Sequence, residues 1–324
     1  MGMRWYIVRR VAWSLFATYL ILSLTWGLLA ATPNKDVRQA QLEAAQRGED
    51  PDAAVERIKK VRGIDKPLWE RYTDYMVNMV TLNWGWSESR SQPVTKAIWT
   101  SLHYSVQYSV PWTIITLILG PAIGLYSAAN QYTTKDHLAT LFAFFGYAIP
   151  NFWFGIILLV IFGVQLGWVP VVYDATVPIF SFANVKQLIL PVFVLVTGSV
   201  GGIMRVSRNE SAEYLNTDFV KTARAKGAGS QRILTRHILR PAAVPMSTTF
   251  VGQMLALFIG ASYLVEVVFG IPGLGMLTLS AIQSQDTALV LGTSLIGIFV
   301  AVIGNLIQDI VYTVLDPRID YGDR

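Results

Sequence analysis

Long apolar stretches restrict the fold of this chain more than any other feature of its sequence. A helix that crosses a bilayer needs about 20 predominantly apolar residues. Only 15% of the 324 residues are charged, whereas soluble domains carry about a quarter. The sequence therefore predicts an all-α membrane protein with six transmembrane helices. Six stretches without a charged residue reach or approach the required length: 11–31, 105–129, 138–168, 187–204, 241–265 and 287–308.

The ends and breaks of these stretches need separate interpretation. The first stretch could be a cleaved signal peptide, but it is longer than the roughly 7–15 residues of a signal core, which favours a retained anchor. Stretch 138–168 is too long for one straight span, and Pro150 predicts a kink near its middle. Segment 267–285 is uncharged and could be a seventh span. Its glycines and Pro272 favour broken, re-entrant backbone instead.

Lys and Arg residues in the short loops indicate the orientation in the membrane. Segment 205–240 carries eight of them, and three more precede the first stretch. In contrast, 173–186 has one and 267–286 has none. We therefore expect the N-terminus and segment 205–240 in the cytoplasm. Six spans keep the C-terminus there as well, whereas seven would place it outside, and the charges of 316–324 do not decide between the two. Segment 32–104, with 11 basic and 10 acidic residues, is expected outside.

Residue patterns for catalysis or metal binding are missing from the sequence. Cysteine is absent, and the three histidines are too scattered for a metal motif. No Gly-Lys pair occurs, so the chain has no phosphate-binding loop of the Walker type. We expect no catalytic residue, no metal site and no cofactor on this chain. Its net charge of +5 is assigned to membrane orientation, with no nucleic-acid partner.

The external segment 32–104 is long enough to fold by itself. Its pattern predicts helices over 37–46, 51–61 and 68–80, the last with a row of aromatic residues. These aromatic side chains either rest on the bilayer interface or dock an external partner.

The basic segment 205–240 predicts a helix–turn–helix. Asn216 or Thr217 would cap a helix over 219–226, which Gly227 would end, and Ser230 would cap a second helix. Ile233, Leu234, His237 and Ile238 share one face of that helix. The segment either only fixes topology or binds a partner in the cytoplasm.

Two acidic residues lie close to membrane depth. Glu266 ends the fifth span on the outer side, and Asp309 lies about two turns before the inner end of the sixth. We interpret both as helix-end charges satisfied by neighbours, in preference to members of a proton relay. Small residues predict close helix packing at Gly120, Gly124, Gly198, Gly201 and Gly202.

Several motifs together resemble ABC-importer permeases, in particular the B-type permeases of the dipeptide, oligopeptide and nickel transporter family. Segment 218–245, which begins Asp-Phe-Val-Lys-Thr-Ala-Arg-Ala-Lys-Gly, is similar to their cytoplasmic EAA loop. Lys221 stands where the acid of that loop would be, and the prolines are displaced to Pro241 and Pro245. The resemblance covers nearly the whole chain. It extends to segments 63–68, 149–153, 166–170, 265–275 and 315–319.

The resemblance implies a type I ABC-importer permease fold with six transmembrane helices in a prokaryotic plasma membrane. Its parts would be an N-terminal anchor (1–31), an external helical segment (32–104) and a five-span core (105–324). Loop 217–240 would couple the chain to a separate ATPase. The implied coupling residues are Thr222, Ala223, Arg224, Ala225, Lys226, Gly227 and Arg232. The residues implied in the translocation path or its gating are Glu266, Phe269, Pro272, Gly273 and Gly275.

The implied function is import of di- or oligopeptides driven by ATP. The implied partners are a second homologous permease, two ABC ATPase subunits that bind ATP and Mg, and an extracytoplasmic substrate-binding protein that meets 32–104. Sugars or nickel complexes are alternative substrates. A secondary carrier or channel is the alternative from another class. A carrier should show inverted repeats and charged residues at mid-membrane, which the sequence does not show convincingly.

Overall fold

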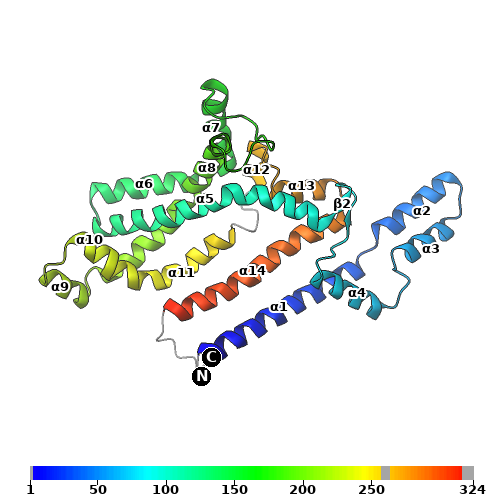
Figure 1. Ribbon diagram of the computed structural model, residues 1–324, viewed down its shortest axis with the longest axis horizontal. Helices are drawn as coiled ribbons and strands as arrows, with labels where there is room; N and C mark the ends of the chain where they lie inside the picture. Colours follow the sequence, from blue (N-terminus) through cyan, green and yellow to red (C-terminus); the bar gives the residue numbers. More distant parts are fainter. Residues whose placement is uncertain (1–2, 257–262, 316–324) are drawn as a thin grey trace. The chain divides into compact units, whose positions relative to one another are not determined.

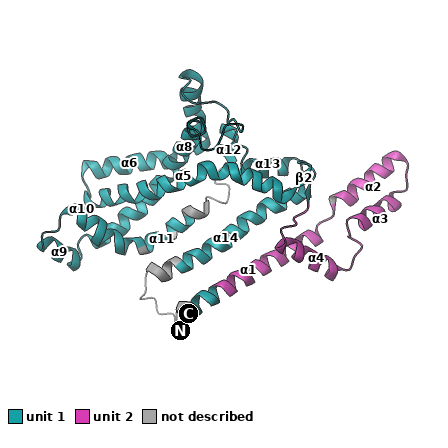
Figure 2. Ribbon diagram, in the orientation of Figure 1, with its two compact units in different colours: residues 1–10, 86–324 teal, residues 11–85 magenta. Residues whose placement is uncertain are grey.

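The computed structural model describes residues 3–256 and 263–315, which are mostly helical (Figure 1). Contacts divide the chain into two compact units, Val11–Gly85 and Met1–Arg10 with Trp86–Arg324 (Figure 2). We refer to them as the small unit and the large unit and describe each by itself.

The small unit contains most of α1 (Met3–Ala31) and the helices α2 (Lys35–Arg47), α3 (Pro51–Val61) and α4 (Leu68–Val80). The three shorter helices confirm the expected pattern of segment 32–104 to within a few residues. The Asn34 side chain accepts hydrogen bonds from the first turn of α2, and Gly48 ends that helix with a φ of 70°. The Tyr72 ring packs edge-on against Trp26, and its hydroxyl lies 2.7 Å from Ser23 Oγ. These contacts join α4 to α1.

The large unit begins with a short antiparallel hairpin, β1 (Trp86–Ser87) and β2 (Gln92–Pro93). The helices that follow are α5 (Val94–Ala129), α6 (Thr134–Ala148), α7 (Asn151–Leu158) with a π-helical continuation (Leu159–Gln165), α8 (Phe182–Tyr214), α9 (Asp218–Ala225), α10 (Ser230–Arg232), a π-helical turn (Ile233–Ile238), α11 (Leu239–Ala256), α12 (Tyr263–Phe269), α13 (Leu274–Gln283) and α14 (Thr287–Leu315). Helix α8 packs along both α5 and α6. Helices α9 and α10 lie at one end of α5, and the hairpin and α13 lie at the other (Figure 1).

Among the described residues, four helices are long and apolar enough to cross a membrane, and up to six spans result if each of two bent helix pairs counts as one. In the first pair, α6 and the helix from Asn151 to Gln165 meet at 96°, a sharper bend than the kink predicted at Pro150. In the second, α12 and α13 meet at 93°, within the segment expected to have broken backbone. The fifth expected span corresponds to α11, whose continuation at 257–262 lies outside the described residues.

Small residues allow the close approach of α8 to its neighbours. A Cβ on Gly124 would lie 2.6 Å from the carbonyl oxygen of Met204, and one on Gly201 would lie 2.4 Å from that of Ala143. The expectation of close packing is thus confirmed at these positions. It is wrong for Gly202, where a Cβ would meet nothing within 4 Å.

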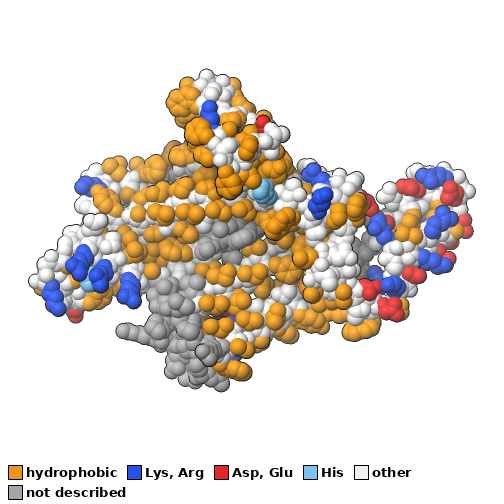
Figure 3. Space-filling model, viewed as in Figure 1, with side chains coloured by type: hydrophobic (Ala, Val, Ile, Leu, Met, Phe, Trp, Pro, Cys, Tyr) orange, Lys and Arg blue, Asp and Glu red, His pale blue; other side chains and the backbone are white. Residues whose placement is uncertain are grey.

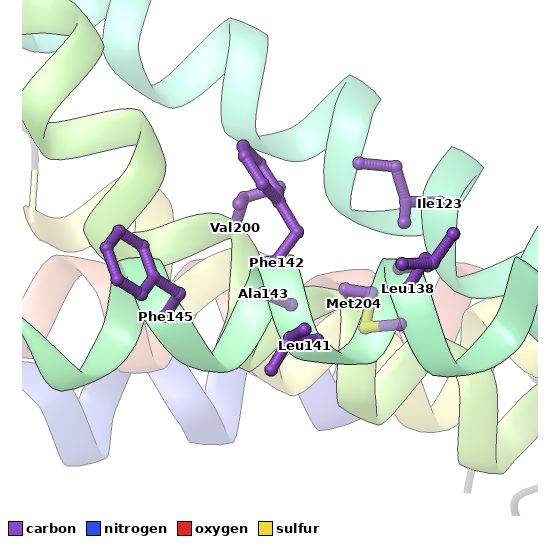
Figure 4. A pocket seen from close by; sticks show the side chains of 9 residues that line it. Ile123, Leu138, Leu141, Phe142, Ala143, Phe145, Val200 and Met204 are labelled. Carbon is purple, nitrogen blue, oxygen red and sulfur yellow. The ribbon is translucent and has the colours of Figure 1, made fainter.

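The core of the large unit is built from side chains of α5, α8 and α12 such as Tyr108, Trp112, Leu195 and Phe269. An apolar cavity of about 640 Å³ lies where α6 faces α5 and α8, and it opens to the surface (Figure 4). Its lining includes the exposed side chains of Leu141, Phe142 and Phe145. Apolar side chains gain nothing by leaving lipid. A surface of this kind is therefore compatible with a bilayer.

Candidate functional site

Helices α9 and α10 form the helix–turn–helix that the sequence predicts. Helix α9 runs from Asp218 to Ala225, and the turn that follows has Gly227 at a φ of 77°. The N–H of Ala228 donates to the carbonyl of Ala223 at 3.0 Å, and that of Gly227 donates to Arg224 at 2.9 Å. This pair of bonds is the Schellman motif, which satisfies the last carbonyls of a helix and requires a left-handed residue.

The expected caps of these two helices are wrong in detail. Thr217 occupies the cap position of α9, but its hydroxyl donates back to the carbonyl of Tyr214 at 2.7 Å and does not cap the helix. Gly229, and not Ser230, stands at the cap position of α10, because its backbone is extended and the next residue is already helical. Backbone geometry therefore starts both helices without a side-chain cap.

The inner face of the helix–turn–helix holds it against the end of α5. Val220, Ile233 and Ile238 are buried in one cluster with Leu125 of α5. Leu234 packs against this cluster, which confirms the shared apolar face predicted for the second helix. Cationic side chains gather over the opposite, exposed surface of α9 and α10 (Figure 3).

Six of the seven residues expected to couple to an ATPase are exposed on this surface, and the seventh faces inward. Ala223 is only 8% exposed and lies on the same buried side of α9 as Val220. The residues available to a partner are Thr222, Arg224, Ala225, Lys226, Gly227 and Arg232.

The second helix continues into α11 without a break. Residues 230–256 are helical throughout, with a π-helical turn from Ile233 to Ile238. Pro241 follows this turn; it lacks an N–H, and its ring would clash with the carbonyl of His237 in a regular α-helix. A π-helical turn is wider than an α-helical one. We attribute it to the need to accommodate this ring.

A buried ion pair joins α6 to α8 near the C-terminal end of α8, which leads to α9. Asp136 is 2% exposed and accepts hydrogen bonds from Nε and Nη2 of Arg208, at 2.9 and 2.7 Å. It also accepts from the hydroxyl of Ser127 and from the N–H of Tyr132. The carboxylate thus ties α5 and the turn before α6 to α8. This group was not predicted from the sequence, although Thr133 and Asp136 have the spacing of a helix-capping box.

At the opposite end, the residues expected to gate the path surround a buried carboxylate. Glu266 of α12 is 0% exposed, and its Oε1 accepts hydrogen bonds from Ser105 and Tyr108 of α5, both at 2.7 Å. Its Oε2 accepts from the N–H of Met276 at 2.7 Å, and the N–H of Leu274 donates to Ser105 Oγ at 2.8 Å. The start of a helix carries unpaired N–H groups and favours negative charge. Glu266 therefore caps α13 from a neighbouring helix.

The glycines of this corner make room for that carboxylate. A Cβ on Gly273 would lie 2.1 Å from Glu266 Oε1, and one on Gly275 would lie 2.6 Å from the Cβ of Tyr263. Phe269 is buried against Gly155 of α7, while Pro272 lies in the bend between α12 and α13. Glu266 is satisfied by neighbours, as expected of a helix-end charge. The same holds for Asp309, whose Oδ2 lies 3.0 Å from Nη1 of Arg10.

The carboxylate of Asp286 joins the hairpin to the start of α14. Asp286 Oδ2 accepts hydrogen bonds from the hydroxyls of Ser87 and Ser89, at 2.6 and 2.7 Å, while Oδ1 accepts from the N–H of Leu289 at 3.1 Å. Burial raises the pKa of the Asp286 carboxyl, but the hydrogen bonds from Ser87 and Ser89 outweigh it and hold this pKa below its ordinary value. This contact was not predicted from the sequence. An Asp before an apolar run signals a helix cap, but nothing local points to Ser87.

Comparisons with known proteins agree with this architecture. Residues 120–321 match the family model described as the binding-protein-dependent transport system inner membrane component. Over 98% of its length, the chain is 35% identical to 99% of the oligopeptide transport system permease protein AppB of Bacillus subtilis. It is 29% identical to the dipeptide transport system permease protein DppB of Lactococcus lactis subsp. cremoris, over 97% of this chain and 98% of that protein.

A solved structure has a similar fold. An inward-facing structure of the MetNI methionine ABC transporter aligns with a TM-score of 0.53 and 14% identity. The alignment covers 68% of this chain and 96% of that one. In the described part of the chain, no group of three or more His, Cys, Asp or Glu residues could hold a metal ion.

Proposed function

The chain belongs to the family of binding-protein-dependent transport system inner membrane components, and we propose that it forms half of the translocation path of an ATP-driven importer of di- or oligopeptides. The family works with an ATPase and a substrate-binding protein and is embedded in the inner membrane by several helices. The peptide substrate is supported by the relatives that match over nearly the whole chain, since their names specify oligopeptide and dipeptide transport.

The exposed surface of α9 and α10 carries the proposal. Thr222, Arg224, Lys226 and Arg232 face outward there, while the inner face of the segment is anchored on Leu125. A structured, basic protrusion with its apolar side already buried presents polar groups to a partner at fixed positions. We assign this surface to the coupling contact with a separate ABC ATPase, which binds ATP and Mg.

The charge distribution supports the arrangement in the membrane. The basic segment 205–240 lies in the cytoplasm together with both termini, and segment 32–104 lies outside, where it meets the substrate-binding protein. A second homologous permease and two ATPase subunits complete the importer. The N-terminal anchor is 1–31, the external segment 32–104 and the core 105–324.

The corner around Glu266 forms the outer gate of the path in this proposal. Ser105 and Tyr108 of α5 and the first turn of α13 all bind one carboxylate. A movement of α5 relative to α13 must therefore break these bonds together. Phe269, Pro272, Gly273 and Gly275 shape the bend that brings α13 to the carboxylate.

Cysteine cross-linking tests the coupling contact directly, because the chain contains no cysteine. A photoreactive cross-linker on Thr222→Cys should capture an ABC ATPase in native membranes. The matched control is Ala223→Cys, whose side chain is buried and should give little product. Equal products from both positions, or no ATPase from either, would refute the coupling contact.

Transport by the reconstituted importer tests the energy source and the substrate. Uptake of a labelled dipeptide into proteoliposomes should require ATP and the binding protein, and an excess of unlabelled peptide should compete. Uptake driven by an ion gradient without ATP would instead support a secondary carrier. Competition by a sugar or a nickel complex, with none by peptides, would refute the peptide substrate.

A further inference from the structure

A cavity of about 330 Å³ lies between α6 and α8 on the face of α6 away from the apolar cavity of Figure 4. We call it the α6–α8 groove. It is distinct from the coupling surface and from the corner around Glu266. Its volume is at the lower end of the range for ligand sites in proteins, about 300–1,000 Å³.

The groove is polar at one end and apolar at the other. Its polar end contains His137 near the start of α6 and Arg205 and Asn209 toward the end of α8. Phe144 and Tyr147 line it further along α6. With a rise of about 1.5 Å per residue, Tyr147 lies about 15 Å from His137 along the helix. The antiparallel α6 and α8 thus bring their polar residues to the same end.

The charge at the polar end is positive. The one carboxylate in the lining is that of Asp136, and it is already bound by Arg208, Ser127 and the N–H of Tyr132. Arg205 is exposed, and none of the described carboxylates forms an ion pair with it. A positive, open end beside an apolar wall is complementary to an amphiphilic anion.

We propose that the α6–α8 groove binds an anionic phospholipid, with its phosphate against Arg205 and His137 and an acyl chain along Phe144 and Tyr147. The apolar end of the groove lies on α6, which has membrane-spanning composition together with the helix that follows it, and an acyl chain is the ligand available there. Basic pockets between transmembrane helices bind lipid headgroups in this way. The lipid joins α6 to α8 at the end from which the coupling segment projects.

Two substitutions test the two ends of the groove separately. Arg205→Gln removes the charge, and its matched control is Lys135→Gln, which removes an exposed charge from the first turn of α6, outside the lining. Gly202→Leu fills the groove, since a Cβ there meets nothing within 4 Å. Gly297→Leu is its control, because that position in α14 is equally open.

The measurement is a titration of the full-length chain, alone and in the assembled importer, with phosphatidylglycerol labelled on its acyl chain. Phosphatidylcholine and inorganic phosphate serve as comparison probes. We expect phosphatidylglycerol to bind more tightly than phosphatidylcholine. Arg205→Gln should weaken phosphatidylglycerol binding about fivefold, since one basic residue near the membrane surface contributes about 1 kcal/mol. Gly202→Leu should weaken the binding of both lipids, and neither control should change it.

Three results would overturn the proposal. The first is equal binding by Arg205→Gln and Lys135→Gln, or no effect of Gly202→Leu. The second is binding of inorganic phosphate as tight as that of the lipid, which would indicate a site for free anions. The third is lipid binding to the isolated chain that is lost in the assembled importer, which would indicate that a protein subunit covers the groove.

Discussion

The left-handed turn at Gly227 makes the strongest prediction about coupling. A Cβ at this position would meet nothing within 4 Å, so within this chain a substitution there acts through the backbone, which has a φ of 77°. For a residue other than glycine, this conformation costs about 1–2 kcal/mol. Such a free energy corresponds to a factor of about 5–30 in the population of the intact turn. Gly227→Ser should therefore reduce ATP-driven uptake several-fold.

Two further substitutions separate this effect from a simple change of sequence. Gly229→Ser places the same side chain two residues away, where φ is −68° and the Cβ also meets nothing within 4 Å. Serine suits a helix cap, so this variant should transport normally. Gly227→Asn should be less impaired than Gly227→Ser, because asparagine tolerates the left-handed conformation.

The assay is the ratio of ATP hydrolysed to peptide taken up by the importer in proteoliposomes. We expect this ratio to rise in Gly227→Ser and to stay at the wild-type value in Gly229→Ser. If both variants transport as the wild type does, the left-handed turn is not required for coupling, and the reasoning from backbone geometry is refuted.

Three other predictions concern the buried carboxylates. Gly273→Ala places a Cβ 2.1 Å from Glu266 Oε1 and should therefore destabilise the protein by about 1–3 kcal/mol. The thermal unfolding temperature should fall in this variant and stay unchanged in Gly297→Ala, whose Cβ meets nothing within 4 Å. An unchanged temperature for both would refute the capping geometry. The folded-state pKa of Asp286 lies below the unfolded one, so its contribution is full above about pH 3.9 and is lost as the pH falls through the folded value. Proteolysis of the hairpin should therefore increase in acid, and Asp286→Asn should reduce that acid dependence. Asp136→Ala leaves Arg208 without its partner and should destabilise the protein by about 2–3 kcal/mol in denaturant titrations, an effect that Arg208→Met in the same chain should partly reverse.

Local features of the fold were predictable from the sequence because their causes are local. Apolar stretches of sufficient length specify helices, and Gly227 ends α9 since glycine adopts the left-handed conformation without strain. The bend at Pro150 and the broken backbone after Phe269 follow from the same kind of signal. The family motifs also pointed to the segments that the structure brings to the two ends of α5.

Contacts between distant residues were not predictable in this way. Ser87 and Asp286 are 199 residues apart, and Ser105 and Glu266 are 161 apart. Whether two such groups meet depends on how the helices pack, which no periodicity or spacing encodes. The inward orientation of Ala223 was not predicted either, although Val220 and Ala223 are three residues apart and therefore share one face of α9.

The unbroken helix from Ser230 to Ala256 has a mechanical consequence. Its 27 residues span about 40 Å at the rise of an α-helix, and the π-helical turn at Ile233–Ile238 and Pro245 are the places where it can bend. A rod of this length that tilts by about 10° about one end displaces the other by about 7 Å. A rotation imposed on α10 reaches residue 256 as a displacement of this size if the helix keeps its shape, and is absorbed if the π-helical turn or Pro245 bends. Helices α10 and α11 thus form one continuous element, and the π-helical turn and Pro245 decide how much of a movement at the coupling surface reaches residue 256.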